Sequence, residues 1–455
     1  MMTKTSRSAL FLCAFGLFGG ACSEAGGDLG EDGEGVGGAP VDAAGGDVSA
    51  GGSQVGSGGS LPGTGGASTG GGNASGGGPA GGASAGGASG GSDASGGAPS
   101  AGGAHSGGTS AGTGGEDTSG AGGVMSGSGG SESGTGGAPA TCAPMGWATR
   151  SGRTNTPFAL TGGGKAAPLV VKNFADLQNA AAGDTPRVIH IDGNLGAGWN
   201  GRSGDRLTVG SNKTIVGLRP GTQLKAPILI KGSSNVIIRN IVIKGPGSNS
   251  DQAWDNLNIE ASKNVWIDHC EFWDGQDGNA DVVKGADNVT FTWNIFGYRT
   301  GGEHNFSNLV ASSDNEPESV GKLNITLMFN WFTGVAQRQP RCRYGDIHIV
   351  NNLFSRDGQV SDYGISAGKD CRVLTEANHF IDIKSPIYTN HASGSSAHQL
   401  KGNNIFENTS GNTTGYGTAF NPPYEYQDRL VPSSEVKALV SSKVGATLES
   451  PDQCD

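Results

Sequence analysis

The stretch Asn264–Phe296, NVWIDHCEFWDGQDGNADVVKGADNVTFTWNIF, decides the fold that we predict for this chain. Its two apolar and β-branched runs, Val265–Phe272 and Val289–Phe296, are typical of short strands. The loop between them contains glycines and the acids Asp274, Asp277 and Asp281. Carboxylates beside two stiff strands are ligands that calcium prefers, although a solvated turn rich in Asp and Gly explains the composition equally well.

The same strand pattern recurs through the second half of the chain. Nine-residue segments, six of the seven with an apolar second position, begin 22 to 36 residues apart, at Asn235, Asn264, Asn288, Asn324, Asp346, Arg372 and His398. The seventh position is Asn in five segments, at Asn294, Asn330, Asn352, Asn378 and Asn404. The ninth is Phe in six, at Phe272, Phe296, Phe332, Phe354, Phe380 and Phe406. A constant segment with loops of variable length predicts a solenoid, in which each coil packs on the next.

Stacked Asn amides can hydrogen-bond along the solenoid axis, and stacked Phe rings can fill its interior. A β-sandwich also has many short strands, but it does not by itself explain Asn and Phe in one register. We therefore predict an all-β protein built as a parallel β-helix.

The composition divides the chain into two parts. Most of the 85 glycines lie before residue 140, so the folded part is roughly the last 315 residues, ample for a large core. The net charge of −11 argues against a nucleic-acid partner, which would require a basic face. An acidic protein that handles a polyanion must concentrate positive charge locally or take it from a metal ion.

The first residues have the form of an export signal. Lys4 and Arg7 precede an apolar run, Ala9–Phe18, that is too short to span a bilayer as a permanent helix. Residues 17–22 resemble the lipidation box of bacterial lipoproteins, which implies a signal peptide over 1–21 and a lipid anchor on Cys22. Cleavage of an ordinary signal peptide near Ala21 is the alternative.

Residues 22–141 are mainly Gly, Ser, Ala and Thr, and they predict a disordered, flexible linker. The folded domain is expected over 142–455. The protein is thus expected at the outer membrane or cell surface as a tethered lipoprotein, and otherwise as a secreted protein.

Cysteines and one helical pattern mark the ends of the folded part. Cys142 and Cys454 could form a disulfide in an exported chain, and Cys270 is expected to be a buried free thiol. The residues from Asn173, stopped by Gly183, predict one short N-terminal capping helix. From Arg187 onward we expect only strands and turns.

Three pieces of sequence carry chemistry. Asp255 lies one coil before Asp277 and Asp281, and coils stacked about 4.8 Å apart would bring these carboxylates to one ion. The run Arg338–Arg343, RQPRCR, is a local basic patch suited to gripping carboxylates, although a solvated arginine-rich turn is the alternative. The insertion Tyr298–Pro317 fills the longest spacing and predicts a loop over a groove.

Three sequence blocks together resemble the signature of pectate lyase family 1. They are Trp266-Ile-Asp-His269, Asp277-Gly-x-x-Asp281-x-x-x-Gly285-x-Asp287-x-Val289-Thr-x-x-Trp293-Asn-x-Phe296, and Arg338-x-Pro340-x-x-Arg343. The similarity extends from Gly146 to the C-terminus, in the family's order and spacing. It implies a right-handed parallel β-helix, the hand coming from the resemblance alone.

The resemblance also implies an activity, calcium-dependent β-elimination on α-1,4-linked polygalacturonate (pectate), which leaves a 4,5-unsaturated sugar end. Asp255, Asp277 and Asp281 match the family's calcium ligands. Arg338 matches the arginine taken as the general base, and Arg343 matches the arginine that holds the substrate carboxylate. We expect a monomer whose partner is pectate and whose only membrane contact is the lipid at Cys22.

Two positions depart from the family pattern. Ala253 stands where many relatives have an additional acid, so we expect calcium to bind more weakly until substrate arrives. Phe306 stands where relatives often have a substrate-binding Lys, and Arg299 or His304 could replace that cation. We expect His269 to brace the structure rather than to take part in catalysis.

Three other functions remain as alternatives. A pectin lyase would act on methylated polymer without metal, which the three aspartates argue against. A hydrolase would use paired carboxylates and water, and would leave the arginine cluster without a role. A non-catalytic protein that binds pectate at the cell surface would not need Arg338.

Overall fold

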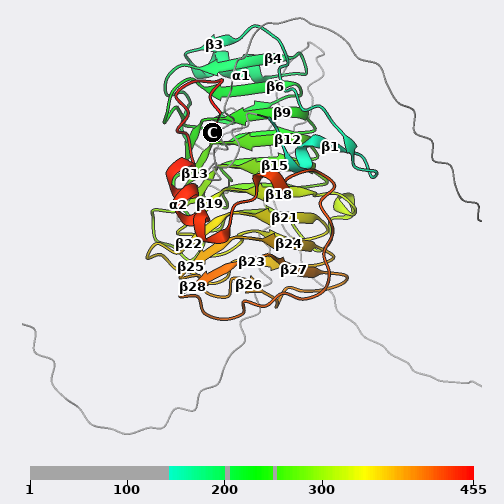
Figure 1. Cartoon of the computed structure of the whole chain (residues 1–455). Coiled ribbons are helices and arrows are strands. Elements are labelled where there is room, and N and C mark those ends of the chain that lie inside the picture. Colours follow the sequence, from blue (N-terminus) through cyan, green and yellow to red (C-terminus); the bar gives the residue numbers. More distant parts are fainter. Residues whose placement is uncertain (1–142, 200–204, 249–253, 455) are drawn as a thin grey trace, which may run out of the picture. The chain divides into compact units, whose positions relative to one another are not determined.

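The computed structural model describes residues 143–199, 205–248 and 254–454, shown as a ribbon in Figure 1. The predicted signal peptide (1–21), the anchor at Cys22, the linker (22–141), Cys142 and Ala253 lie outside the described residues. The predictions made for them therefore stay predictions.

The described chain winds through three parallel sheets, to each of which successive coils add one strand. Sheet I consists of β3 (Leu169–Val171), β4 (Arg187–Ile191), β6 (Lys213–Gly217), β9 (Ser234–Arg239), β12 (Lys263–Asp268), β15 (Asp287–Thr292), β18 (Ile325–Met328), β21 (Asp346–Val350), β24 (Arg372–Glu376) and β27 (Ala397–Lys401). Sheet II consists of β7 (Gln223–Leu224), β10 (Val242–Lys244), β13 (Glu271–Trp273), β16 (Ile295–Gly297), β19 (Trp331–Thr333), β22 (Leu353–Ser355), β25 (His379–Ile381) and β28 (Ile405–Glu407). Sheet III consists of β5 (Leu207–Val209), β8 (Ile228–Lys231), β11 (Leu257–Glu260), β14 (Ala280–Val283), β17 (Leu309–Val310), β20 (Arg341–Cys342), β23 (Ile365–Ala367) and β26 (Ile387–Tyr388).

This architecture confirms the right-handed parallel β-helix predicted from the sequence. The register repeats the predicted alignment, since Val289 of β15 pairs with Val265 of β12 and with Ile325 of β18. Equivalent residues of the repeat therefore lie directly above one another from coil to coil.

The predicted strand runs were wrong in one respect, because each nine-residue segment holds two strands instead of one. The sixth residue of six segments has a positive φ, for example His269 at 49° and Trp293 at 55°. This left-handed residue turns the chain between sheet I and sheet II. The loop between the two runs also holds a strand, β14, and the insertion Tyr298–Pro317 contributes β17 before η3 (Pro317–Ser319). These short strands form sheet III, where the chemistry lies.

The interior contains the predicted ladder of amides and rings. The Nδ2 group of Asn330 donates to Oδ1 of Asn352 at 2.9 Å, and Nδ2 of Asn352 donates to Oδ1 of Asn378 at 3.1 Å. The six Phe rings stack in sequence with centroids between 4.4 and 5.4 Å apart. Because each buried amide is satisfied by the next coil, the ladder fixes the register as well as filling the core.

The first described coils are closed by the predicted helix, α1 (Phe174–Ala181), whose N-cap Asn173 accepts a hydrogen bond from the backbone N–H of Asp176. A 3-10 turn, η1 (Gly146–Thr149), and a short antiparallel pair, β1 (Arg150–Ser151) and β2 (Thr156–Pro157), precede it. Within the described residues, no helix is long and apolar enough to cross a membrane.

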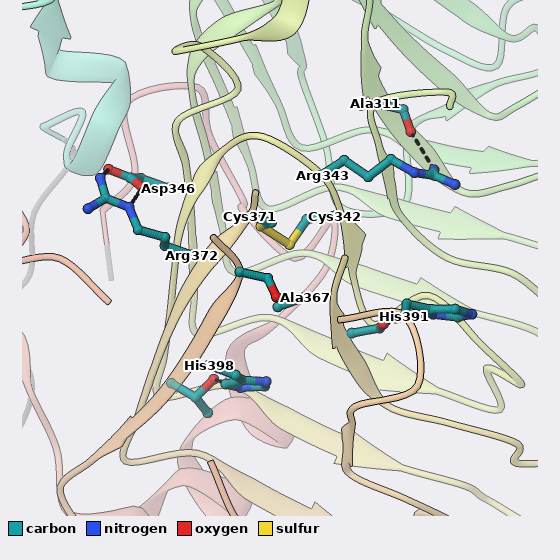
Figure 2. The surroundings of a disulfide bond; sticks show 12 residues. Ala311, Cys342, Arg343, Asp346, Ala367, Cys371, Arg372, His391 and His398 are labelled. Atoms are coloured by element: carbon teal, nitrogen blue, oxygen red, sulfur yellow. Dashed lines mark hydrogen bonds and ion pairs between the residues drawn. A yellow bond between two sulfur atoms is a disulfide. The ribbon is translucent and has the colours of Figure 1, made fainter. Parts of the chain in front are cut away.

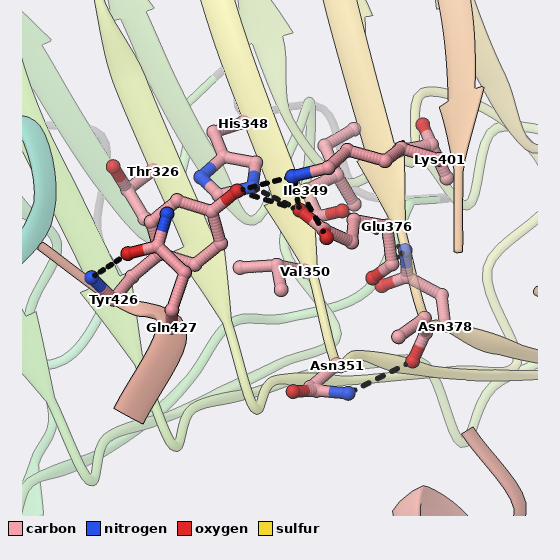
Figure 3. Close-up of polar contacts among 12 residues, drawn as sticks. Thr326, His348, Ile349, Val350, Asn351, Glu376, Asn378, Lys401, Tyr426 and Gln427 are labelled. Carbon is pink, nitrogen blue, oxygen red and sulfur yellow. Dashed lines mark hydrogen bonds and ion pairs between the residues drawn. The ribbon is translucent and has the colours of Figure 1, made fainter. Parts of the chain in front are cut away.

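The expectation of only strands and turns after Arg187 was wrong. The C-terminal segment forms η4 (Gln427–Arg429) and α2 (Ser433–Lys443), which packs against β22 and β25 of sheet II. The same segment crosses sheet I, where the Tyr426 hydroxyl donates to Glu376 at 2.8 Å and Lys401 donates to Tyr426 at 2.9 Å (Figure 3). The repeat pattern could not predict this segment, because the segment covers the solenoid and is not one of its coils.

Two cysteine expectations can be compared with the structure. Cys270 is a buried free thiol, as predicted, and Cys342 forms a disulfide with Cys371 that the sequence did not specify. Cys454 is disulfide-bonded. Its predicted partner, Cys142, lies outside the described residues, so that pairing stays a prediction.

Candidate active site

Asp281 lies on β14, on the outer face of sheet III. Its neighbours Ala280 and Val282 belong to the core, so strand alternation turns Asp281 outward. One carboxylate oxygen, Oδ1, accepts a hydrogen bond from the backbone N–H of Leu309 in the next coil at 3.0 Å. The carboxylate is thereby held at a fixed position between two coils.

Asp255 approaches the same position from the residues just before β11. The Asn258 amide donates to Oδ2 of Asp255 at 3.1 Å, whereas Oδ1 of Asp255 is buried and has no hydrogen-bond partner. A β-carbon placed on Gly278 would lie 2.8 Å from Oδ1 of Asp255 and 3.0 Å from Oδ1 of Asp281. The two oxygens therefore converge on a space that exists because residue 278 has no side chain.

Two buried carboxylates that face one space disfavour their own ionised forms. Burial raises the pKa of Asp281 to about 7; the Arg338 charge acts in the opposite direction and the Asp277 charge adds to the increase. Burial, followed by the charges of Asp281 and Asp277, raises the pKa of Asp255 well above its usual value. A divalent cation between these groups would relieve both burial and repulsion.

The donor set fits a calcium ion. Calcium prefers carboxylate and other oxygen ligands, and Oδ1 of Asp255 is an unpartnered oxygen directed at the space beside Gly278. Among the described residues, no group of three or more acidic, His or Cys side chains is gathered closely enough to form a complete ion cage. Asp255 and Asp281 would therefore provide the core of such a site, and Asp277 would have to join them.

Asp277 faces a different partner. Its Oδ1 lies 3.1 Å from Nε2 of His304, and about half of each side chain is exposed. The hydrogen bond to His304 lowers the pKa of Asp277, against the effect of burial. His304, one of the two proposed replacements for the family lysine, thus belongs to the site but is engaged with a carboxylate of the protein.

Arg338 lies near the three aspartates without an ion pair to any of them among the described residues. Its charge acts to lower the pKa of Asp255, Asp277 and Asp281. The group lies 4.3 Å from the centre of the Phe306 ring, and its buried Nε has no hydrogen-bond partner among the described residues. The residue itself has a φ of 63° in the turn before β20. The fold therefore brings Arg338 into the neighbourhood of the predicted acids, and the roles assigned to these residues stay predictions.

Arg343 is almost fully buried and is held by the protein. Its Nε donates to Oδ1 of Asp314 at 2.5 Å. One terminal nitrogen donates to the carbonyl of Ala311 at 3.0 Å, as Figure 2 shows. The disulfide between Cys342 and Cys371 lies directly beside it. Asp314 has 62% of its side chain exposed, so an incoming anion can compete for Arg343.

Arg299, the other proposed replacement cation, is not brought to the aspartates. Its guanidinium lies 3.9 Å from the centre of the Trp273 ring, and its backbone N–H donates to Asp274. His269, which was expected to brace the structure, is buried and bonded to Asp268 at 2.9 Å. The structure thus assigns both residues to sites outside the acidic cluster.

The sequence reasoning did not single out Arg341. It lies on β20 in register with Leu309 and Ser366, and burial lowers the pKa of its guanidinium. Strand alternation around the buried Cys342 could have shown that Arg341 and Arg343 project from the same outer face. Ser366 in turn bonds His391, whose pKa is lowered to about 4 by burial and by the charges of Arg341 and Arg343.

Known proteins resemble this chain in sequence and in fold. A family model described as pectate lyase matches residues 133–448. Pectate lyase A of Aspergillus niger is 32% identical over 316 residues, which cover 67% of this chain and 88% of that protein. Pectate lyase E of Dickeya chrysanthemi is 32% identical over 294 residues, which cover 54% of this chain and 74% of that protein. The solved structure of a Bacillus sp. N165 pectate lyase in complex with trigalacturonate has a TM-score of 0.54 at 25% identity, covering 66% of this chain and 98% of that one.

Proposed function

This chain belongs to the pectate lyase family and cleaves pectate, and we propose that it does so by calcium-dependent β-elimination at the site formed by the three aspartates and Arg338. In this proposal Asp255, Asp277 and Asp281 hold the ion, and Arg338 accepts the proton. The observation that supports it best is the space beside Gly278, on which an unpartnered oxygen of Asp255 and an oxygen of Asp281 converge.

The reaction breaks the C5–H and C4–O bonds of one galacturonate unit and forms a C4–C5 double bond. A bound calcium ion would neutralise the sugar carboxylate next to C5 and stabilise the negative charge that develops there. Arg338 takes the C5 proton, the electron pair forms the double bond, and the departing oxygen takes a proton from water. Because a guanidinium accepts a proton only after losing one, activity is expected to increase toward alkaline pH.

Arg343 would bind a carboxylate of the polymer. A guanidinium grips a carboxylate through two parallel hydrogen bonds, and Asp314 occupies this position in the described fold. Because Asp314 is largely exposed, the substrate can displace it without leaving a buried charge unpaired. His304 would orient Asp277 until the ion attracts that carboxylate.

We further propose that the enzyme is a monomer that is exported and tethered by a lipid at Cys22, with residues 22–141 as the spacer. Mass spectrometry of the membrane fraction tests this directly. A diacylglyceryl modification at Cys22 is expected, and a mature chain that starts elsewhere without lipid would overturn the tether.

The function is tested by incubating the full-length protein with polygalacturonate and following ultraviolet absorbance with calcium and then with a chelator. Absorbance that depends on calcium is expected. Absorbance that survives chelation and requires methylated polymer would indicate a pectin lyase. New reducing ends without absorbance would indicate a hydrolase, and binding without cleavage would indicate a surface adhesin.

The role of Arg338 is tested by Arg338→Lys, which keeps the charge but removes the forked shape. We expect kcat to decrease by about 100-fold or more, with far less change in KM. Arg372→Lys, in an exposed pair with Asp346, is the matched control and should keep full activity. Full turnover in Arg338→Lys would exclude Arg338 as the proton acceptor.

A further inference from the structure

Phe306 is an aromatic residue that the core does not explain. It lies two residues after His304 in the insertion, and it is partly exposed. The described residues form three apolar clusters, and Phe306 packs against none of them. Its neighbours are instead Arg338, 4.3 Å from the ring centre, and His304, whose ring centre is 3.9 Å away. A large apolar side chain therefore contacts two polar groups of the active site.

The backbone of Phe306 is firmly held although the ring is not buried. Its carbonyl accepts a hydrogen bond from the Tyr298 hydroxyl at 2.7 Å, and the residue forms a parallel bridge with Gln337, next to Arg338. The flanking residues Asn305 and Ser307 are completely buried. The backbone that carries the ring is thus held in one position.

Arg338, by contrast, has little to hold its side chain. The structure gives its guanidinium no hydrogen bond or ion pair with any described residue, and its Nε is buried without a partner. An arginine side chain loses rotamer entropy when it is fixed in one orientation. Something must restrain the group if it is to meet the substrate in one geometry.

We propose that Phe306 is a positioning residue, whose ring sets the orientation of the Arg338 guanidinium over the three-aspartate site. This inference rests on the proposed role of Arg338. An aromatic face attracts a guanidinium and defines its plane. Unlike a carboxylate or carbonyl, the face leaves the edge nitrogens of the guanidinium without hydrogen bonds, so they remain available to the substrate.

The same contact gives position 306 a role in this chain that a lysine would not have. The Arg338 guanidinium lies 4.3 Å from the ring centre, so the residue at position 306 contacts Arg338 through an uncharged face. His304, in contact with the same ring, links the assembly to Asp277.

The test compares Phe306→Leu, which removes the aromatic face, with Phe306→Tyr, which keeps it. Phe306→Leu should lower kcat by about 10-fold and change KM by less than about twofold, while Phe306→Tyr should stay within about twofold of the wild type. The matched control is Phe420→Leu, which removes a ring lying 5.9 Å from Arg372 outside the site. This control should leave both constants unchanged.

A double-mutant cycle makes the test specific for Arg338. On the Arg338→Lys background, Phe306→Leu should lower kcat by less than about twofold, because the group that it positions is already altered. If the two effects multiply, or if Phe306→Leu changes KM and not kcat, the positioning role is excluded. If the Phe306→Leu variant does not fold, Phe306→Met is used in its place. Failure of the proposed function is seen separately, as a wild type without calcium-dependent product or an Arg338→Lys variant with full activity.

Discussion

The interior ladder of Asn and Phe and the outer face of sheet III follow the same coils but obey different rules. In the interior ladder one residue type repeats from Asn294 to Asn404, and each amide is bonded to the next. On the outer face, the residues at one register position change at every coil, from Asn258 to Asp281, and from Leu309 to Arg341, Ser366 and Tyr388.

The two regions also differ in how well their polar groups are satisfied. The ladder amides donate to carbonyls and to the neighbouring Asn, as Asn352 does to Leu327 and Asn378. Around the outer face, Oδ1 of Asp255, Nε of Arg338 and the hydroxyl of Tyr363 have no hydrogen-bond partner. Buried polar groups are normally paired, so these three unpaired groups around one site mark positions that a ligand can complete.

The largest expected effect is on activity, and it comes from a substitution on the outer face that should not lower stability. Asp281→Asn should lower kcat/KM about 1000-fold, since it removes a charge from the proposed ion site. Its folded pKa of about 7 exceeds the unfolded value of 3.8, so the contribution of Asp281 to stability is full below pH 3.8 and is lost as pH rises through 7. At pH 8 with chelator, the neutral Asn should therefore make the protein at least as stable as the wild type.

Steady-state kinetics and urea unfolding measure the two effects on one preparation. Asp192→Asn, in an exposed cluster with Lys172 and Arg219, is the control and should change neither by much. If Asp281→Asn lost stability in proportion to activity, the outer face would be part of the scaffold and the contrast between the regions would fail.

The disulfide is the element that joins the two regions. Cys342 and Cys371 are both fully buried and 29 residues apart, and Cys342 separates Arg341 from Arg343. Replacing both with Ala should lower the free energy of unfolding by about 3–4 kcal/mol. Because Arg343 is adjacent, kcat/KM should also decrease, by about threefold to tenfold.

Cys270→Ala is the matched control for that pair, since it truncates a buried free thiol in the interior. It should cost about 1 kcal/mol and leave the kinetic constants unchanged. Equal kinetics for the disulfide variant and the wild type would show that the position of Arg343 does not depend on the core beneath it.

Within the ladder, Asn352→Ala should affect stability alone. The substitution removes the donors to Leu327 and Asn378 and the acceptor for Asn330, so buried polar groups are left unpaired. The expected cost is about 2–3 kcal/mol in urea unfolding, with kcat unchanged. Asn403→Ala, at an exposed position, should cost less than about 0.5 kcal/mol. A decrease in kcat for Asn352→Ala would contradict the separation of the two regions.

This contrast also explains what could be predicted from the sequence. The Asn and Phe positions repeat because every coil faces the same neighbour, so the solenoid, its register and the ladder were predictable. The acids Asp255, Asp277 and Asp281 were singled out by their types and their places on neighbouring coils, and their role as calcium ligands, implied by the family resemblance, stays a prediction. Arg341 was not singled out because no equivalent arginine recurs in the other coils. Its alternation with the buried Cys342 did indicate that its side chain faces outward.

Other features depend on contacts that no local pattern encodes. Helix α2 and the hydrogen bond from Tyr426 to Glu376 form where the C-terminal segment folds back over the coils that precede it in the chain. The pairing of Cys342 with Cys371 depends on which residues meet across a coil. The stacking of Phe306 on Arg338 joins two loops 32 residues apart, one of which departs from the family pattern.

The smallest effect comes from a place where the interior departs from its own pattern. His398 of β27 pairs with Val373, at the end of a column that is apolar from Val236 to Val373, and its Nε2 lies 2.8 Å from the Thr375 hydroxyl. Burial lowers the pKa of His398 to about 3, below the unfolded value of 6.5. Between these two pH values the unfolded chain binds a proton at His398 and the folded chain does not. The stability contributed by neutral His398 is therefore full above pH 6.5 and decreases as pH falls toward 3. Each bound proton can change stability by up to about 1.4 kcal/mol per pH unit.

His398→Leu should accordingly flatten the dependence of urea unfolding on pH between 6.5 and 4.5, while calcium-dependent activity at pH 8 stays unchanged. Parallel stability curves for the two proteins would mean that the last coil opens to admit the proton, and the interior would then be less uniform than its ladder indicates.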